Sequence, residues 1–406
     1  MSYFWWPAVI LLAGLFGVLF VQYLSVHPLD MSYYLFSSCV ILFVLVVVLI
    51  VGFKREALLI AVFVSLGGFT IGHLSMTRII LARDDLRPVP ELTRAPGDPG
   101  LGHIAVVYFT HGEPETYNPI GWINQFNEFD EQGIAFVPLI ARPFFFNALR
   151  RKYLKVGKSD HRKMHIRMVE SIEEAYRAEG DTSTKFYLSF LDDNPRPDAA
   201  AIQALNEGAS KIIVSEVFLT ISNHTAEGER QIEELNIKES FGIPVEFTGP
   251  LYDSRTLMSM FVNRANSNIG DTDKSKVGIL LVGHGQPDEW DLEWPTETQQ
   301  ELGFRKDVIA MLAADGYQAE NLSMAWMEFK EPKPAEKVEE FLQNGIEKLL
   351  FFSAAISADA IHSQHDIPAL IYEAQYPENF PIIDLGAWND DPIVIQAIKE
   401  KIDSFM

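Results

Sequence analysis

Cysteine is almost absent from this sequence. The 406 residues include one cysteine, Cys39. A disulfide within one chain needs two cysteines, and Cys-rich zinc sites and Cys-ligated iron–sulfur clusters need several. The composition therefore excludes all three within one chain, so any metal site has to use other ligands.

Charged side chains are also missing from three long stretches near the N-terminus, residues 1–29, 31–53 and 57–77. Each stretch is at least as long as the roughly 20 residues that an α-helix needs to cross the hydrocarbon core of a membrane. A cleaved signal peptide does not fit, because no basic segment comes first and the apolar stretch is too long. We therefore expect residues 1–82 to be a membrane anchor of three transmembrane helices. The expected helices are about 4–25, 33–53 and 57–80.

The third apolar stretch and its flanks bear on helix packing and on orientation. Gly68 and Gly72 form a GxxxG motif. Such a motif allows close helix packing, but it also arises by chance in apolar helices, and chance is the interpretation that we favour. Two basic residues, Lys54 and Arg55, precede the third predicted helix, and Arg83, Arg87 and Arg94 follow it, so the positive-inside bias is small. We expect the remainder of the chain on the cytoplasmic face.

Basic side chains are outnumbered in the rest of the chain. The sequence has 33 Lys and Arg against 55 Asp and Glu, a net charge of −22, and residues 1–82 hold only three of the basic and two of the acidic residues. Nearly all of the negative charge thus lies beyond residue 82. Such a surface repels nucleic acid and anionic lipid headgroups, and we expect no nucleic-acid partner.

The residues after the anchor divide into a linker and two similar halves. The Pro- and Gly-rich residues 83–101 predict a linker. The polar residues 264–276 then separate a first half, 102–266, from a second half, 277–406. Each half closes with a helix-like segment, a glycine, a lysine and another apolar run.

Apolar runs that alternate with helical stretches are typical of parallel strands covered on both faces. Each half opens with such a run ending in His-Gly-x-Pro, IAVVYFTHGEP at 104–114 and ILLVGHGQP at 279–287. We expect the α/β fold class, with two similar Rossmann-like half-domains, each a doubly wound parallel sheet. A cleft between them at the carboxyl ends of the strands would hold the site.

Histidines of the second half are the first candidates for chemistry. His284 lies between two glycines, which let the backbone turn sharply and approach a ligand; the alternative is a histidine that merely caps a strand turn. His362 and His365 begin a predicted helix, followed by Asp366; the alternative is a pair of solvated helix residues. Because both motifs end strands of one half, we expect His284 and His362 to face one cleft, where two imidazoles suit a divalent transition metal.

The first half repeats this pattern with His111 and His224. The repeat predicts either a second site or an inactive copy. We favour one active half, the second.

Residues 141–167 are basic and aromatic, although the chain as a whole is acidic. It has nine Lys or Arg and one acid, Asp160, beside the three consecutive phenylalanines 144–146. Such an apolar lip next to cations suits a flat ligand with peripheral carboxylates or the surface of a lipid bilayer. The alternative is a solvated helix face.

Several motifs resemble those of the class II tetrapyrrole chelatases, which comprise ferrochelatase and the cobalt and sirohydrochlorin chelatases. GEPE at 112–115 is similar to the ferrochelatase Gly-Thr-Pro-Glu, and YLKVGKSDHR at 153–162 to Tyr-x-x-Ile-Gly-Gly-x-Ser-Pro. VGHGQP at 282–287 is similar to Ser-Ala-His-Ser-Leu-Pro, and DAIHSQHDI at 359–367 to Asp-His-Ile-Glu-Thr-Leu-His-Glu-Ile. Each motif is short, but their order and spacing agree over about residues 102–400.

The resemblance places His284 on the metal-site histidine of the family and His362 where ferrochelatases carry a catalytic glutamate. The cobalt and sirohydrochlorin enzymes have His-x-x-x-Asp-Ile-Pro there, as this chain does from His362 to Pro368. The resemblance implies a bent tetrapyrrole in the cleft, with His284 and His362 binding the incoming metal or accepting a pyrrole proton. Metal and tetrapyrrole are both substrates, and no tightly bound cofactor is implied.

The expected reaction is insertion of Fe²⁺ into a porphyrin in haem biosynthesis. Insertion of Co²⁺ or Fe²⁺ into sirohydrochlorin is one alternative, and a non-catalytic carrier of tetrapyrrole or metal is another. A membrane anchor suits a porphyrin substrate, because protoporphyrin and haem partition into bilayers. Guanidinium groups hold carboxylates in two places and would pair with propionates. The candidate tetrapyrrole-binding residues are Arg142, Phe144, Phe145, Arg150, Arg151 and Glu328.

Overall fold

The computed structural model describes residues 6–25, 29–51, 55–82, 88–131 and 137–406. The chain forms two compact units. Unit 1 comprises Met1–Leu86 and Thr116–Gly157, and unit 2 comprises Arg87–Glu115 and Lys158–Met406. The chain thus leaves unit 2 after Glu115 and returns to it at Lys158. Within the expected linker, residues 83–87 lie outside the described part.

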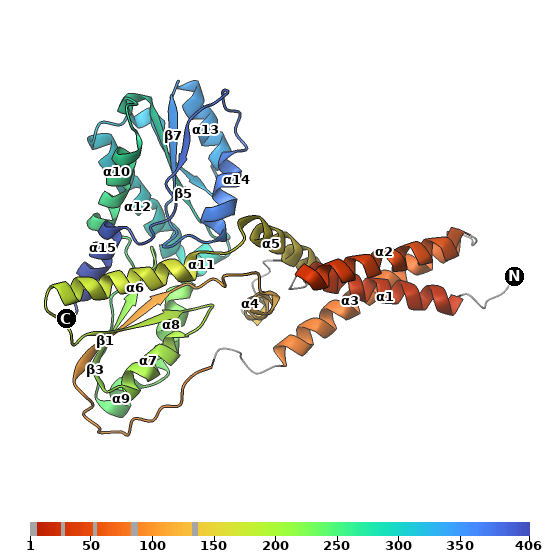
Figure 1. Cartoon of the computed structure of the whole chain (residues 1–406), viewed down its shortest axis with the longest axis horizontal. Coiled ribbons are helices and arrows are strands. Elements are labelled where there is room, and N and C mark those ends of the chain that lie inside the picture. The colour runs from red at the N-terminus through yellow and green to blue at the C-terminus, as the bar shows by residue number, and fades with distance from the viewer. Residues whose placement is uncertain (1–5, 26–28, 52–54, 83–87, 132–136) are drawn as a thin grey trace. The chain divides into compact units, whose positions relative to one another are not determined.

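Unit 1 consists of helices (Figure 1). They are α1 (Trp6–Ser25), α2 (Leu29–Val51), α3 (Arg55–Leu81), α4 (Pro119–Glu131), the short 3-10 helix η2 (Leu139–Ala141) and α5 (Arg142–Val156). Three of them, α1, α2 and α3, are long and apolar enough to cross a membrane, and they match the predicted helices within a few residues. Large apolar side chains such as Phe43, Phe63 and Ile71 are exposed on α2 and α3.

Glycines bring α1 and α3 close together. A Cβ atom on Gly68 would lie 2.3 Å from the carbonyl oxygen of Gly14, and a Cβ atom on Gly72 would lie 3.1 Å from the Cα atom of Val18. No side chain fits at the first distance, and the second is tighter than almost all real contacts. The GxxxG motif is therefore a helix-packing contact, and the expectation that it arose by chance is wrong.

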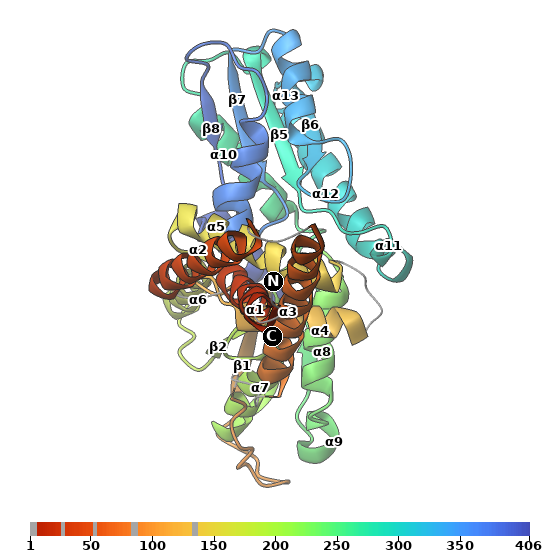
Figure 2. The ribbon, with the colours of Figure 1, turned by 90° about the vertical axis from the view of Figure 1, so that its right-hand side faces the viewer.

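Unit 2 contains two four-stranded parallel sheets of the same topology (Figures 1 and 2). The strands of the first, in the order β2-β1-β3-β4, are β1 (His103–Thr110), β2 (Lys185–Phe190), β3 (Ala209–Glu216) and β4 (Val245–Phe247). The strands of the second, in the order β6-β5-β7-β8, are β5 (Val277–Gly283), β6 (Leu322–Trp326), β7 (Lys348–Ser353) and β8 (Ile382–Asp384). The predicted pair of doubly wound parallel sheets is confirmed.

Helices connect the strands. In the first half they are α6 (His161–Ala178), α7 (Pro197–Asn206), α8 (Asn223–Glu233), α9 (Ile237–Phe241) and α10 (Arg255–Asn268). In the second half they are α11 (Trp290–Glu293), α12 (Pro295–Ala314), α13 (Pro334–Gln343), a π-helical turn (His362–Asp366), α14 (Ile367–Ile371) and α15 (Pro392–Asp403), with the short 3-10 turns η3 (Lys274–Lys276) and η4 (Ala319–Asn321). Part of the polar stretch 264–276 is thus the end of α10, whose Ala265 is buried.

Both faces of each sheet are covered, as the continuous apolar runs require. Successive side chains of β1 point to opposite faces. Val106 and Tyr108 enter a core that includes residues of α6, α10, α12 and α15, while Val107 and Phe109 enter a second core with residues of α7 and α8. In β5, Ile279 and its alternate neighbours share the first core, and the opposite face packs under α13 and α14.

The two halves exchange their last helices. Helix α10 follows β4 but packs against α12 and α15, and α15 follows β8 but packs against α6 and β3. The Tyr176 hydroxyl of α6 donates a hydrogen bond to Asp403 of α15 at 2.5 Å. The first core is therefore common to both halves, and the carboxyl ends of β1 and β5 belong to one folded body.

Candidate active site

In each sheet a histidine follows the strand that comes first in the chain. His111 follows β1 and His284 follows β5. The backbone around the two histidines is bonded in the same way, because the His111 carbonyl accepts from the Asp192 N–H at 2.8 Å and the His284 carbonyl accepts from the Glu328 N–H at 3.1 Å. The two halves thus present equivalent His and carboxylate positions, as the repeated His-Gly-x-Pro predicted.

The glycine after His284 is required by geometry. Gly285 has a φ of 81°, which side-chain-bearing residues rarely adopt. A Cβ atom there would also lie 2.4 Å from the Glu328 carbonyl oxygen. The glycine before it is equally constrained, because a Cβ atom on Gly283 would lie 1.9 Å from Oε1 of Glu301. The turn out of β5 therefore requires glycine at 285, and the space at 283 is taken by the buried Glu301 and Arg305 side chains.

The His284 imidazole is held in one tautomer. Its Nδ1 lies 2.6 Å from the Gly285 carbonyl oxygen, which can only accept, so Nδ1 carries the proton and Nε2 carries a lone pair. Burial, together with repulsion from His362, lowers the pKa of His284 to about 4, although Glu328 opposes the shift. His284 is therefore neutral near neutral pH, which is the form that binds a metal ion.

His362 has the opposite electrostatics. It begins the π-helical turn, in which the Ile367 N–H bonds to the His362 carbonyl. Burial alone would lower the pKa of His362, but the hydrogen bond and charge of Asp366, aided by Glu328 and Glu113, raise it. The same carboxylate also lies 3.0 Å from Nδ1 of His365. Asp366 therefore orients two histidines of this turn, and His362 is the more basic partner of His284.

His284 and His362 lie together, as predicted. Their ring centroids are 5.2 Å apart and the ring planes are inclined by 74°. Two imidazoles that bind one metal ion at about 2.0–2.1 Å place their centroids about 4.5–5.5 Å apart. In the part of the chain that the structure describes, no group of three or more His, Cys, Asp or Glu is arranged to hold a metal ion. The pair thus leaves most coordination positions of a metal open.

The N-terminal pair is just as close. The ring centroids of His111 and His224 are 4.6 Å apart, and Nδ1 of His111 lies 2.8 Å from the Gly112 carbonyl oxygen. Burial and the charge of His111 hold the pKa of His224 well below its usual range, and His284 contributes to this effect. The four histidines therefore lie near enough to influence one another.

Two glutamates were missed by the sequence analysis as site residues. The half-buried Glu113, in the His-Gly-Glu-Pro loop of the first half, accepts a hydrogen bond from the Ile361 N–H at 3.0 Å, just ahead of His362. Burial raises the pKa of Glu113. The buried Glu301 accepts from the His284 N–H at 3.2 Å and pairs with the buried Arg305. Both carboxylates position histidines, and neither motif spacing nor composition pointed to them.

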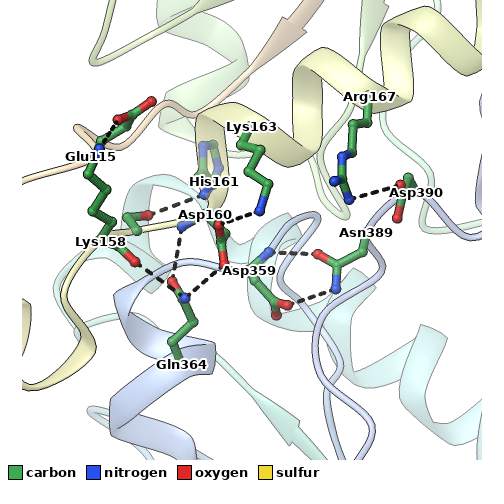
Figure 3. Close-up of polar contacts among 11 residues, drawn as sticks. Glu115, Lys158, Asp160, His161, Lys163, Arg167, Asp359, Gln364, Asn389 and Asp390 are labelled. Atoms are coloured by element: carbon green, nitrogen blue, oxygen red, sulfur yellow. Dashed lines mark hydrogen bonds and ion pairs between the residues drawn. The ribbon is translucent and has the colours of Figure 1, made fainter.

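Hydrogen bonds join the segment before α6 to the π-helical turn (Figure 3). The Asp160 N–H donates to the side-chain oxygen of Gln364 at 3.1 Å, and the Gln364 amide donates to the Lys158 carbonyl at 3.4 Å. Asp359, ahead of the turn, exchanges two hydrogen bonds with the Asn389 side chain, at 2.8 and 2.9 Å. The His362 turn is therefore fixed from both halves.

The predicted tetrapyrrole-binding residues of the lip all lie in unit 1. Arg142 is buried and forms an ion pair with Asp130, and Phe145 packs edge-on against Trp122 with ring centroids 5.4 Å apart. The buried Arg150 donates to the Tyr23 carbonyl at 2.8 Å. Phe144 and Arg151 are exposed. Glu328, the remaining residue of this set, lies in unit 2 and acts electrostatically on both His284 and His362.

Known proteins resemble the two-half part of the chain. Residues 103–405 match the family model described as Ferrochelatase. A sirohydrochlorin cobaltochelatase of Methanothermobacter thermautotrophicus is 29% identical over 110 residues, which are 26% of this chain and 63% of that protein. The match thus spans less than two thirds of the relative's own length.

Solved chelatase structures also align with the chain. The sirohydrochlorin chelatase SirB from Bacillus subtilis subspecies spizizenii in complex with cobalt gives a TM-score of 0.45 at 10% identity, over 74% of this chain and 94% of that one. SirB from Bacillus subtilis with Fe³⁺ gives a TM-score of 0.47 at 13% identity, over 74% of this chain and 95% of that one. The family model, which runs from the start of β1 to beyond the end of α15, shows that the chain belongs to the ferrochelatase family.

Proposed function

We propose that this chain is a membrane-anchored chelatase that inserts Fe²⁺ into a porphyrin. The observation that carries the proposal is the pair of imidazoles of His284 and His362, 5.2 Å apart and unequal in basicity. Membership of the ferrochelatase family supports the reaction class. The three apolar helices support an anchor, which would keep the enzyme beside a substrate that dissolves in the bilayer. We place unit 2 on the cytoplasmic face.

The two histidines have different roles in the proposed mechanism. Metal insertion requires the metal ion to shed water and the macrocycle to lose two pyrrole protons. The neutral His284 offers its Nε2 lone pair to the incoming ion. His362, whose basicity Asp366 increases, accepts the pyrrole protons one at a time and passes them to solvent. Each turnover thus consumes M²⁺ and free porphyrin and releases metalloporphyrin and two protons.

The metal and the macrocycle are the parts of the proposal for which a second candidate exists. Two imidazoles with open positions suit Fe²⁺, Co²⁺ and Ni²⁺, and the general order of affinities does not select among them. The length of the family match favours the ferrochelatase reaction. His362 in place of the ferrochelatase glutamate, and the name of the relative from Methanothermobacter, favour sirohydrochlorin and cobalt as the second candidate.

The lip residues remain predictions as ligands of the macrocycle. A propionate would have to compete with Asp130 for Arg142 and with the Tyr23 carbonyl for Arg150. Arg151 and Glu328 do not face that competition in the contacts described above. We therefore retain Glu328 as a residue of the insertion site, and the role of Arg151 toward a carboxylate stays a prediction.

The test follows insertion by absorbance, with the full chain in detergent. Anaerobic Fe²⁺ or Co²⁺ is mixed with protoporphyrin or sirohydrochlorin, and wild type is compared with His284→Ala and His362→Ala. His111→Ala and His224→Ala are the matched variants of the other half. We expect catalysed insertion of Fe²⁺ into protoporphyrin that is lost in the first two variants and kept in the second two.

Each other outcome has a definite meaning. Loss confined to His111→Ala and His224→Ala would move the active pair to the first half. A preference for sirohydrochlorin would establish the second candidate. Tight binding with no rate above the protein-free control, unchanged in all variants, would leave a carrier and refute the mechanism.

A further inference from the structure

Helix α5 carries an exposed stripe that changes from apolar to basic along its length. Phe144, Ala148, Arg151 and Lys155 are all exposed, and their spacing of three or four residues places them on one side of the helix. At 1.5 Å per residue the stripe is about 16 Å long. It has two apolar residues at its N-terminal end and two cations at its C-terminal end.

The apolar end continues into the turn before the helix. Leu139 and Ile140 of η2 are 42% and 57% exposed, and Phe144 is 52% exposed. We call these three side chains the apolar tip, and Arg151 with Lys155 the basic end. Neighbouring large apolar side chains that stay exposed mark a surface that meets another apolar phase.

Phe144 of the apolar tip packs onto the transmembrane-length helices. The Phe144 ring stacks on Phe69 of α3 at a centroid distance of 5.7 Å and meets Phe20 of α1 edge-on at 6.3 Å. Phe20 and Phe69 both lie inside helices that are long and apolar enough to cross a membrane. With those helices in a bilayer, Phe144 lies at the depth of its hydrocarbon.

The middle of α5 is tied to the end of α1. The Arg150 guanidinium donates to the Tyr23 carbonyl at 2.8 Å and lies over the Tyr23 ring. The Tyr117 hydroxyl, ahead of α4, donates to the Ser25 carbonyl at 3.1 Å. These carbonyls belong to the last turn of α1, where the helix itself supplies no donors. The bonds therefore hold α5 at the level where α1 leaves the hydrocarbon.

The basic end matches the charge of a bilayer surface. Cations just outside the hydrocarbon are attracted to anionic phospholipids, whereas a chain with a net charge of −22 is repelled by them as a whole. We propose that α5 and η2 are seated in the bilayer interface, with the apolar tip among the acyl chains and the basic end on the phosphates of anionic phospholipids. This inference rests on the membrane anchoring in the proposed function.

The first test measures depth with nitroxide labels on the full chain in bilayers that contain an anionic phospholipid. Replacement of Cys39 by Ser removes the only native cysteine, and single cysteines are then placed at Ile140, Ala148, Leu154, Phe63 or Gln318. Collisions with oxygen, which dissolves in the bilayer, are compared with collisions with a water-soluble nickel chelate. We expect oxygen to dominate at 63 and 140, nickel to dominate at 318, and 148 to lie deeper than 154.

The controls separate the two proposals. Phe63 is 71% exposed on α3 and reports on the anchor alone. If the label at 63 lies in the bilayer while the label at 140 meets nickel, the anchor stands and the seating of α5 is refuted. If the label at 63 also meets nickel, the anchor itself is refuted.

The second test addresses the lipid charge. The label at 140 is measured with and without anionic phospholipid, in the unaltered helix and in Arg151→Glu/Lys155→Glu. Lys238→Glu/Lys306→Glu, at two exposed lysines of unit 2, is the matched charge control. We expect anionic lipid to deepen the label, and only the α5 double variant to lose that response. A depth that ignores lipid charge, or that responds to added porphyrin instead, would overturn the proposal.

Discussion

Oδ2 of Asp366 lies 2.8 Å from Nδ1 of His362, and its other oxygen lies 3.0 Å from Nδ1 of His365. One carboxylate thus fixes two imidazoles of the same π-helical turn. Such turns are rare in proteins, and those that occur often lie at functional sites. Here the turn directs the Nε2 edge of His362 away from Asp366 and lets the ring lie next to His284.

Asp366→Asn is expected to slow metal insertion without unfolding the chain, because His362 is the proposed acceptor of the pyrrole protons. An amide can keep a hydrogen bond to Nδ1, but it removes the negative charge that makes His362 basic. Partners of this kind typically change metal affinity or activity by roughly 10- to 100-fold. The insertion rate of the full chain in detergent, followed by absorbance, measures the effect. A rate within about twofold of wild type would show that Asp366 does not tune His362.

Gly283→Ala is expected to disrupt the packing of the buried side chains next to His284. The new Cβ atom would lie 1.9 Å from Oε1 of Glu301 and 2.5 Å from Cζ of Arg305, both of which are buried. We expect a loss of roughly 3 kcal/mol or more in the free energy of unfolding, measured by chemical denaturation of the full chain in detergent.

The matched control for that variant is Gly303→Ala. Gly303 lies in α12, the helix of Glu301, and a Cβ atom there meets nothing within 4 Å. Because alanine favours a helix over glycine, this change should stabilise the chain by roughly 0.5–1 kcal/mol. Equal effects of the two alanines would contradict the steric argument.

Gly68→Leu is expected to separate α1 from α3. The position has no room, since a Cβ atom would lie 2.3 Å from the Gly14 carbonyl oxygen. Gly67→Leu is the control, because a Cβ atom on Gly67 meets nothing within 4 Å. A cysteine cross-link between α1 and α3 would form readily in the control and poorly in Gly68→Leu. Equal cross-linking would show that the glycines do not set the helix distance.

Much of unit 2 was predictable because its signals are local. The apolar runs of β1 and β5, the His-Gly-x-Pro after each and the spacing of His362 and Asp366 can all be recognised within a few residues. Glu113 was missed because its bond to the Ile361 N–H joins residues 248 positions apart. Such a contact depends on how the halves pack, and no short pattern records it.

The insertion between the two parts of unit 2 was harder to predict for a different reason. Its cations and phenylalanines suit a carboxylate ligand or a membrane equally well by composition. Composition does not record the partners of these residues, and Arg150 and Phe144 have theirs on α1 and α3. The GxxxG motif was likewise ambiguous until the Gly14 carbonyl was found against Gly68.

The raised pKa of Glu216 predicts how the free energy of unfolding depends on pH. It is 2% exposed at the end of β3, and burial, with the nearby Glu229, raises its pKa to about 9. Between the unfolded value of about 4.3 and that folded value, the unfolded chain has lost the proton that the folded chain retains. Stability therefore falls as pH rises through this window, by up to roughly 1.4 kcal/mol per pH unit.

Glu216→Gln removes that dependence, because an amide stays neutral in both states. The free energy of unfolding of the variant, relative to wild type, should rise steadily from about pH 5 to about pH 8. Glu173→Gln, at a carboxylate on the surface of α6 that pairs with Arg177, serves as the control for the change from carboxylate to amide. Parallel curves for Glu216→Gln and wild type would mean that Glu216 ionises as readily in the folded chain as in the unfolded one, with the buried end of β3 open to water.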